Sequence, residues 1–219
     1  MAIIKLTENI SYLPASEKPL SCDVVFIKTN KATWIFDVGC NKESVEEIKK
    51  IEGQKNVVIS HFHPDHILNL IRIKADNLYV TKYTKKYTLA GQVLEGTTVF
   101  NEEPEISIVE FPSSHAKGCL ALVCGDYAFL GDGAYAKPRK GNHFYNVQLL
   151  QQMIQTMENL NVKYFCLSHD ENFVQNKEIV IKLYKSIYSR KEDNNPVISV
   201  EDFFNNDGSV KSADEQPKI

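Results

Sequence analysis

Three histidines and an aspartate are crowded into one short run, Ser60-His61-Phe62-His63-Pro64-Asp65-His66. His61 and His63 are two residues apart, so their side chains project together only from an extended or turning segment. Asp65 and His66 follow directly and can face a second position close by. Imidazole and carboxylate groups gathered at one place are costly unless something satisfies them, and a bound metal ion is the usual solution. The spacing therefore predicts a metal site.

The residues on either side of this run indicate how it is held. The apolar run Val57-Val58-Ile59 predicts a short buried strand that ends just before the histidines. Pro64 cannot extend a strand ladder, so the chain must turn there. The sequence from His66 to Ile71 then predicts the start of a helix. The histidines are expected at the carboxyl end of a strand.

Further histidines and aspartates follow other predicted strands. His115 comes after the strand predicted at 106–111, Asp132 after 127–130 and His169 after 164–167, and Asp37 lies at the end of the strand predicted at 33–38. Taken singly, each would be an ordinary structural histidine or turn aspartate. Because the loops at strand ends gather at one edge of a sheet and often carry function, the set as a whole indicates a single site.

This pattern resembles the metallo-β-lactamase fold superfamily, whose signature is His-x-His-x-Asp-His, then a His, an Asp and a final His, each after a strand. Here it spans residues 33 to 169. The resemblance implies an α/β (α+β) fold, a four-layer αββα sandwich of two mixed β-sheets flanked by helices. It also implies two metal ions, with Asp37 acting from behind the ligands. The implied ligands are His61, His63 and His115 for the first ion, Asp65, His66 and His169 for the second, and Asp132 as a bridge.

The resemblance implies a dinuclear metal-dependent hydrolase in which a metal-bound hydroxide attacks a small ester, thioester, lactone or phosphodiester. In the resembled family Asp65 is both a ligand and the residue that orients the hydroxide. Nitrogen and carboxylate ligands without a thiolate suit Zn²⁺, with iron and manganese as alternatives. Asp132 stands where one subclass of true β-lactamases has a cysteine, which favours the glyoxalase II and lactonase side of the family.

Two other classes of function remain open. One is an iron-dependent oxidoreductase on the same fold, resembling a sulfur dioxygenase. His63 argues against the flavo-diiron branch, which usually has Glu at that position. The other is a non-catalytic, metal-stabilised binding protein. Metal analysis would separate the first two, since zinc favours hydrolysis and iron with oxygen uptake favours the dioxygenase.

The loop after Asp132 carries the candidates for substrate contact. Lys137 and Arg139 would favour an anionic substrate, either a carboxylate or a phosphate, although a solvated cationic loop is the alternative. His143 is a further substrate candidate or a plain surface histidine. Tyr135 is a candidate catalytic residue because lactonases of the resembled family place a tyrosine similarly, and aromatic packing is its alternative role.

Composition narrows the partners. The 219 residues carry 25 Lys and Arg against 28 Asp and Glu, a net charge of −3 that favours neither a nucleic-acid nor a membrane partner. A small-molecule substrate is the expected partner, and the oligomeric state is not predicted. No stretch is as long and apolar as a spanning helix, and the first residues have no secretory pattern. Five scattered cysteines without a CxxC pair indicate a reducing cytoplasm.

We expect one metallo-β-lactamase-like domain over residues 1–190, followed by a polar and partly disordered tail over 191–219. Within the tail, residues 197–204 could dock on the domain. Residues 134–145 are expected to form a loop. Apolar periodicity predicts the longer helices at 147–160 and 177–188, and a further helix that is capped by Asn41 or Ser44 and runs through Ile51.

Overall fold

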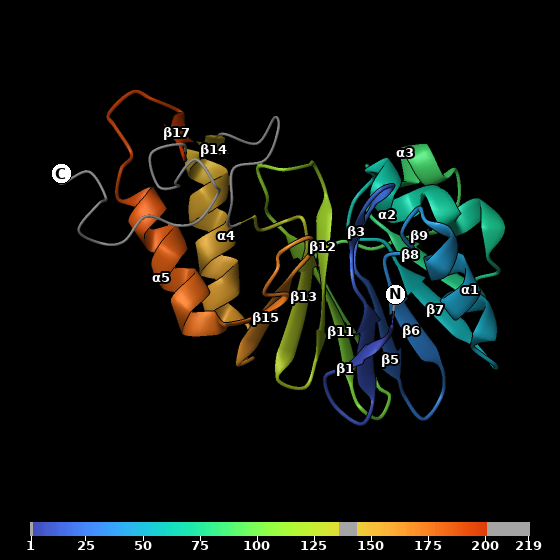
Figure 1. Cartoon of the computed structure of the whole chain (residues 1–219). Coiled ribbons are helices and arrows are strands. Elements are labelled where there is room, and N and C mark those ends of the chain that lie inside the picture. Colours follow the sequence, from blue (N-terminus) through green and yellow to red (C-terminus); the bar gives the residue numbers. More distant parts are fainter. Residues whose placement is uncertain (1, 136–143, 201–219) are drawn as a thin grey trace.

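The computed structural model describes residues 2–135 and 144–200, in which two mixed β-sheets face each other and helices cover both outer faces (Figure 1). The predicted four-layer αββα sandwich is confirmed. Three helices cover the first sheet: α1 (Lys42–Lys50), α2 (Pro64–Ile67) and α3 (Lys85–Thr88). Two helices cover the second: α4 (Val147–Asn159) and α5 (Lys177–Tyr188). None of the helices in these described ranges is long and apolar enough to cross a membrane.

The first sheet has seven strands, antiparallel from β1 to β6 and parallel from β6 to β9. In spatial order they are β1 (Ile4–Lys5), β2 (Ile10–Leu13), β5 (Val24–Lys28), β6 (Thr33–Phe36), β7 (Lys55–Val58), β8 (Asn77–Val80) and β9 (Gln92–Val93). A small hairpin between β2 and β5 consists of β3 (Ser16–Glu17) and β4 (Leu20–Ser21).

Within the described residues the second sheet has six strands, of which only β13 and β15 pair in parallel. In spatial order they are β10 (Thr97–Phe100), β11 (Ile106–Phe111), β12 (Cys119–Cys124), β13 (Tyr127–Gly131), β15 (Tyr164–Leu167) and β16 (Val174–Asn176). The observed β11, β13 and β15 match the predicted ranges to within one residue, because short apolar runs mark these strands in the sequence.

Alternate residues of one strand pack into different layers of the core. In β5, Val25 and Ile27 pack between the two sheets, whereas Val24 and Phe26 pack with Ile48 of α1 on the outer face. Side chains alternate across a strand, so a strand that is apolar throughout must be covered on both faces. This explains why β5 needs both the opposite sheet and a helix.

Asparagine caps three of the helices. The Asn41 side chain accepts a hydrogen bond from the Ser44 amide at α1. Asn146 and Asn176 cap α4 and α5 in the same way. A side-chain oxygen at this position satisfies amides that the first turn leaves without partners. The predicted helix after His66 is shorter than expected, because α2 passes at Leu68 into a 3₁₀ turn.

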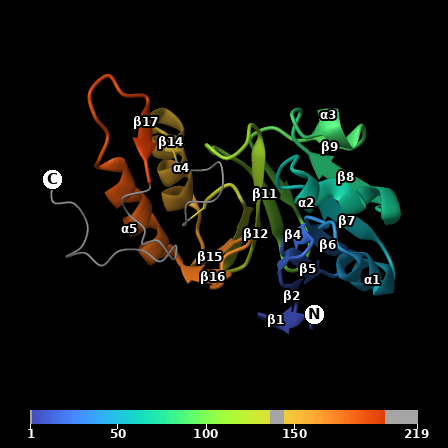
Figure 2. The same cartoon turned by 45° about the horizontal axis from the view of Figure 1, so that its top comes forward.

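Two segments expected to be irregular contain short strands. The expected loop at 134–145 ends in β14 (Phe144–Asn146), which pairs with β17 (Val197–Ser199) near α4 (Figure 2). Ile198 and Val200 are buried in the core beneath this ribbon. Part of the segment assigned to the tail therefore belongs to the folded domain at least as far as Val200. Residues 201–219 lie outside the described residues.

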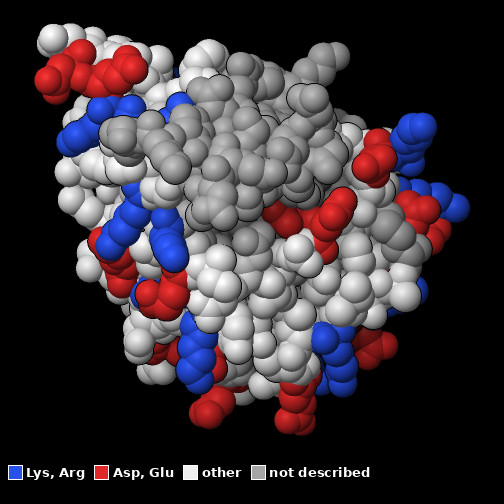
Figure 3. Space-filling view, turned by 60° about the vertical axis from the view of Figure 1, so that its left-hand side comes forward, with Lys and Arg blue, Asp and Glu red and all other residues white. Residues whose placement is uncertain are grey.

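The outer face formed by α4 and α5 carries both signs of charge. In Figure 3, Lys and Arg are interspersed with Asp and Glu on the described part of this face. Mixed charge of this kind does not form the basic stripe typical of nucleic-acid binding.

Candidate metal centre

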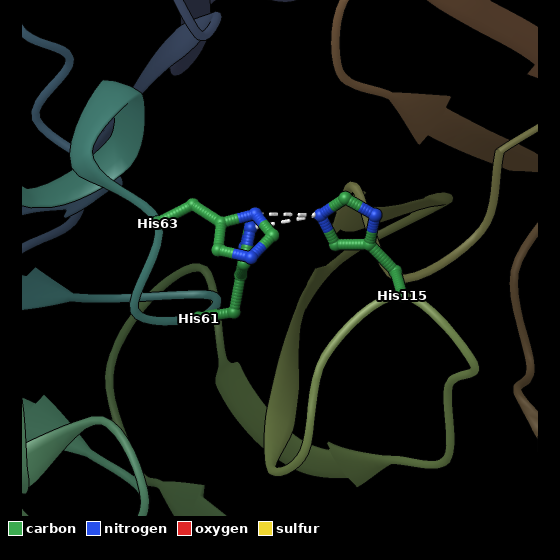
Figure 4. A group of neighbouring side chains, drawn as sticks. All are labelled: His61, His63 and His115. Carbon is green, nitrogen blue, oxygen red and sulfur yellow. Dashed lines mark hydrogen bonds between the residues drawn. The ribbon is translucent and has the colours of Figure 1, made fainter. Parts of the chain in front are cut away.

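Three of the predicted ligands converge on one point, as Figure 4 shows. His61 follows β7, His63 caps the start of α2, and His115 lies in the loop between β11 and β12. The His115 Nε2 atom is 3.1 Å from His61 Nε2 and 2.9 Å from His63 Nδ1. A tetrahedral zinc ion with Zn–N bonds of about 2.0–2.1 Å places its ligand nitrogens about 3.3 Å apart. The three rings therefore have the spacing that one ion requires.

The remaining four predicted ligands form a second group beside the first. The Asp65 Oδ2 atom is 3.0 Å from His169 Nε2 and 3.6 Å from His66 Nε2. Asp132 faces both groups, with Oδ1 3.4 Å from His66 Nε2 and Oδ2 3.5 Å from His115 Nε2. This arrangement allows the Asp132 carboxylate to bridge two ions.

Two buried atoms at the junction of the groups indicate that the residues present fit a metal. His66 Nε2 and Asp132 Oδ1 are inaccessible to solvent and make no hydrogen bond with any described residue. Buried polar atoms without a partner are rare in proteins and call for an explanation, such as an ion that lies between them. The predicted dinuclear ligand set is thus brought together as two groups that share Asp132.

The first group is prepared for metal binding by its protonation state. Burial lowers the pKa of His61 far below its ordinary value, and the positive charge of His66 adds to this. The same two effects lower the pKa of His63, and burial lowers the pKa of His115 to about 4. All three rings are therefore neutral at pH 7, and a neutral imidazole is the form that binds a metal.

The second group is held together by charge. Burial alone would raise the pKa of Asp132, but His66 and His169 outweigh it and hold the carboxylate ionised. Burial also opposes ionisation of Asp65, and a hydrogen bond with His169 overcomes it and lowers the pKa. His66 is the reverse case, since Cys22, Asp37 and Asp132 outweigh burial and raise its pKa. A metal ion that binds here would replace the proton of His66.

Comparisons with known proteins agree with this fold. A family profile described as "Metallo-beta-lactamase superfamily" matches residues 18–102. No curated protein matches the chain in sequence.

Solved structures are similar over most of the chain. An archaeal metallo-β-lactamase superfamily protein from Sulfolobus tokodaii is 16% identical over 86% of this chain and 90% of its own, with a TM-score of 0.58. A subclass B3 metallo-β-lactamase with an active-site glutamic acid is 11% identical over 87% and 90%, with a TM-score of 0.65. A diiron chemotaxis sensor is 12% identical over 87% and 94%, also with a TM-score of 0.65. The chain has the metallo-β-lactamase fold.

In this metallo-β-lactamase fold protein Asp37 lies on the side of the His66 ring away from Asp65 and Asp132. Its Oδ2 atom accepts a hydrogen bond from His66 Nδ1 at 2.7 Å, and its Oδ1 atom accepts one from the Ser60 amide at 2.7 Å. The Ser60 hydroxyl lies 2.9 Å from His61 Nδ1 and 3.3 Å from His66 Nδ1. Because a carboxylate can only accept, the His66 proton is fixed on Nδ1, and Nε2 is directed toward the second group of ligands.

Sequence reasoning missed residues that hold the ligand loops. The Ser113 hydroxyl donates to the Gly133 carbonyl at 2.6 Å and accepts from the His115 amide at 3.0 Å. It thereby ties the loop of His115 to the loop that follows Asp132. Asp23 and Ser168 make a similar link to His169. Asp23 stands at the beginning of a strand, so a search of strand ends could not find it, whereas Ser168 directly precedes a predicted ligand.

The structure does not bring Tyr135 into the cleft. Its hydroxyl donates to the Phe144 carbonyl at 2.8 Å, and its ring stacks on that of Tyr145 with centroids 4.5 Å apart. Tyr135 is 7% exposed and is not one of the described residues that line the cleft. Its observed contacts are those of aromatic packing. The substrate candidates Lys137, Arg139 and His143 lie outside the described residues.

Five of the seven predicted ligands line a cleft of about 1010 Å³ that is open to solvent, while His61 and His66 are buried beneath it. Tyr12, whose ring stacks on that of Phe173, forms an apolar wall together with residues of the β3–β4 hairpin. Glu17, Asp170 and Glu171 add carboxylates to the lining, and no Lys or Arg occurs among the described lining residues. The cleft has the size of a small-molecule site.

Close packing at Gly131 leads to a prediction about stability. Gly131 has φ +55°, and an added Cβ would lie 2.7 Å from both Cβ and Oγ of Ser60. Gly125 has φ +56° but no atom within 4 Å of an added Cβ. We expect Gly125→Ala to lower the free energy of unfolding by about 1–2 kcal/mol through backbone strain alone. Gly131→Ala should cost about 1–3 kcal/mol more, because it also displaces Ser60.

Urea unfolding of the two variants and the parent measures this difference. Both substitutions place alanine in the same left-handed backbone conformation, so the comparison isolates the contact with Ser60. Equal losses of stability in the two variants would mean that the approach of Gly131 to Ser60 is not tight.

Proposed function

We propose that this protein is a dinuclear metal-dependent hydrolase that acts on a small ester, thioester, lactone or phosphodiester. The observation that carries the proposal is a pair of ligand groups that share Asp132 and lie in an open cleft. Two divalent ions bound there would lower the pKa of a shared water toward 7 and polarise the bond to be cleaved.

The residues of the chain would divide the remaining work. The first ion would be held by His61, His63 and His115, and the second by Asp65, His66 and His169. Asp132 would bind both ions. Asp37 and Ser60 would keep the His61 and His66 rings in the orientation that binding needs.

Asp65 is the residue we assign to proton transfer. Its side chain is 16% exposed and lines the cleft, so it can reach a water that approaches the substrate. Its pKa is lowered, which keeps it ionised and able to accept the proton of that water. No serine or cysteine nucleophile is required.

Zinc is the metal we propose, because the ligands are nitrogens and carboxylates. The five free cysteines fit a cytoplasmic protein. We propose an anionic substrate only on the basis of Lys137 and Arg139, which could pair with its negative charge. The described residues that line the cleft include carboxylates, which would repel such a substrate.

A second candidate is an iron-dependent oxidoreductase. The observation in its favour is the likeness in fold to a diiron chemotaxis sensor. The same histidines and carboxylates suit iron as well as zinc. A non-catalytic binding protein is the third candidate and predicts metal binding without turnover.

The first test of the proposal is metal content. Protein purified without chelators and dialysed after addition of zinc should contain two ions per chain, and His169→Ala should lose one of them. His143→Ala is the matched control, since His143 is the one histidine outside the predicted ligand set, and it should keep both ions. Parent protein without bound metal would overturn the central claim.

Activity on a panel of thioesters, lactones, activated esters and phosphodiesters completes the test. We expect the zinc-loaded protein to hydrolyse at least one class and His169→Ala to lose most of that activity. If only the iron-loaded protein is active, and consumes oxygen, the oxidoreductase is correct. Full zinc loading without turnover across the panel would favour the binding protein.

A further inference from the structure

Asp23 joins three parts of the molecule at the edge of the candidate metal centre. It lies between β4 and β5 and is 5% exposed. Its Oδ1 atom accepts a hydrogen bond from the Ala15 amide at 3.0 Å. Its Oδ2 atom accepts from the His169 amide at 2.8 Å and from the Ser168 hydroxyl at 3.2 Å. The Asp23 amide in turn lies 3.2 Å from the Ser168 hydroxyl.

The backbone of His169 needs such a partner. His169 has φ +61°, in the left-handed region that residues with a Cβ seldom adopt. This conformation costs about 1–2 kcal/mol relative to the right-handed one. The charge-assisted hydrogen bond from its amide to Asp23 offsets this cost. Without that bond, the chain at the end of β15 would relax toward a more common conformation.

The position of the His169 ring depends on this backbone. His169 Nε2 is 3.0 Å from Asp65 Oδ2 and 3.8 Å from Asp132 Oδ1. A change of φ at His169 would carry the whole ring away from both carboxylates. The ligands of the first group lie on other segments, so the same change would leave them in place.

Asp23 also acts on the wall of the cleft. Ala15 belongs to the segment between β2 and β3, and it lines the same cleft as Asp65 and His169. One buried carboxylate therefore fixes a cleft wall from the first half of the chain and a ligand from the second half. Asp23 and His169 are 146 residues apart in the sequence.

We propose that Asp23 is a positioning residue for the second metal subsite, holding His169 in the left-handed conformation from which its ring meets Asp65 and Asp132. The inference rests on the proposed function, because it supposes that this subsite binds an ion. It differs from a general structural role in predicting a loss at one subsite and not at the other.

The experiment is a calorimetric titration of metal-free, full-length protein with zinc. The second subsite is identified as the one that His169→Ala abolishes. We expect Asp23→Asn to weaken zinc binding at the second subsite by about 10- to 100-fold, the usual effect of removing a group that holds a ligand. Binding at the first subsite should stay within about threefold of the parent. Absorption of the cobalt-substituted protein gives a second, spectroscopic readout of the same site-selective loss.

Two further variants separate geometry from charge and folding. Asp170→Asn removes a cleft carboxylate next to His169 and leaves the contacts of Asp23 intact, so it should keep second-subsite affinity within about threefold. Ser168→Ala removes one donor to Asp23 and should weaken the second subsite by about 3- to 10-fold. If Asp23→Asn does not fold, Ser168→Ala decides the matter by the same site-selective criterion.

The outcomes distinguish this inference from the proposed function. Parent protein that binds no zinc overturns both. Parent protein that binds two ions while Asp23→Asn binds both within threefold overturns the role of Asp23 alone. Equal weakening of both subsites in Asp23→Asn, or an equal loss in Asp170→Asn, also overturns it.

Discussion

Replacing Asp65 by asparagine is expected to lower the rate constant of the chemical step by about 100-fold or more at saturating zinc. Asparagine keeps the shape of the side chain and one oxygen, but it loses the negative charge and cannot accept a proton from water. Asp65 lines the cleft and its lowered pKa keeps it ionised, so both lost properties are ones that the parent protein has. Single-turnover kinetics on a good substrate would measure the effect.

The control for this prediction is metal occupancy. The first subsite should stay filled in Asp65→Asn, because His61, His63 and His115 are untouched. Rates must be compared at zinc concentrations that also fill the weakened second subsite. Asp126→Asn, which removes an exposed carboxylate paired with Lys163, should keep activity within about twofold. A fully loaded Asp65→Asn that turns over within about threefold of the parent would exclude Asp65 as the proton acceptor.

The clustering of the candidate ligands could be predicted because His61, His115, Asp132 and His169 each follow a strand whose apolar residues are visible in the sequence. Short apolar runs predict β7, β11, β13 and β15. β7 belongs to the first sheet and the other three to the second, so the candidate site lies where the two facing sheets meet and not at one edge of a single sheet. The chemistry of histidine and aspartate then indicates a metal. At these positions the local apolar pattern and the residue type are sufficient for the prediction, because neither depends on a contact with a distant segment.

Other features depend on contacts between distant segments and leave no local pattern. Asp23 reaches His169 across 146 residues, and Ser113 reaches Gly133 across a turn of the second sheet. The β14–β17 ribbon is another example, because Val197–Ser199 has little apolar length of its own and becomes a strand only by pairing with Phe144–Asn146. At Tyr135 a local pattern is present but the expected contact is not. Its place in the sequence resembles that of a lactonase tyrosine, whereas its hydroxyl donates to the Phe144 carbonyl.

The metal-free protein is expected to be most stable near pH 6.5. Folding lowers the pKa of some histidines below this value and raises the pKa of His66 above it. His61, His63 and His115 have lowered pKa values, so below pH 6.5 the unfolded chain takes up protons that the folded chain refuses. The free energy of unfolding should therefore fall by a few kcal/mol between pH 6.5 and about pH 4. Each unit of pKa shift contributes about 1.4 kcal/mol to this fall. His66 has a raised pKa, so its contribution is complete below pH 6.5 and is lost as pH rises through its folded pKa.

Saturating zinc should change both limbs of this profile. At pH 7.5 each ion at 1,000 times its Kd adds about 4 kcal/mol to the free energy of unfolding. The fall above pH 6.5 should disappear, because binding releases the proton of His66. Below about pH 6 the gain from zinc should shrink, because protons compete with the metal for His66, whose pKa is raised.

Urea unfolding at several pH values, with chelator and with zinc, measures both profiles. The matched control is His169→Ala. Without zinc it should lose stability below pH 6.5 as the parent does, because the first group is unchanged. At pH 7.5 zinc should raise its free energy of unfolding by the amount expected for one bound ion. Magnesium at the same concentration should add little, since it prefers oxygen ligands and retains its water. A gain from zinc as large at pH 5 as at pH 7.5 would mean that zinc does not displace the proton of His66, and the second group of ligands would then not be a zinc site.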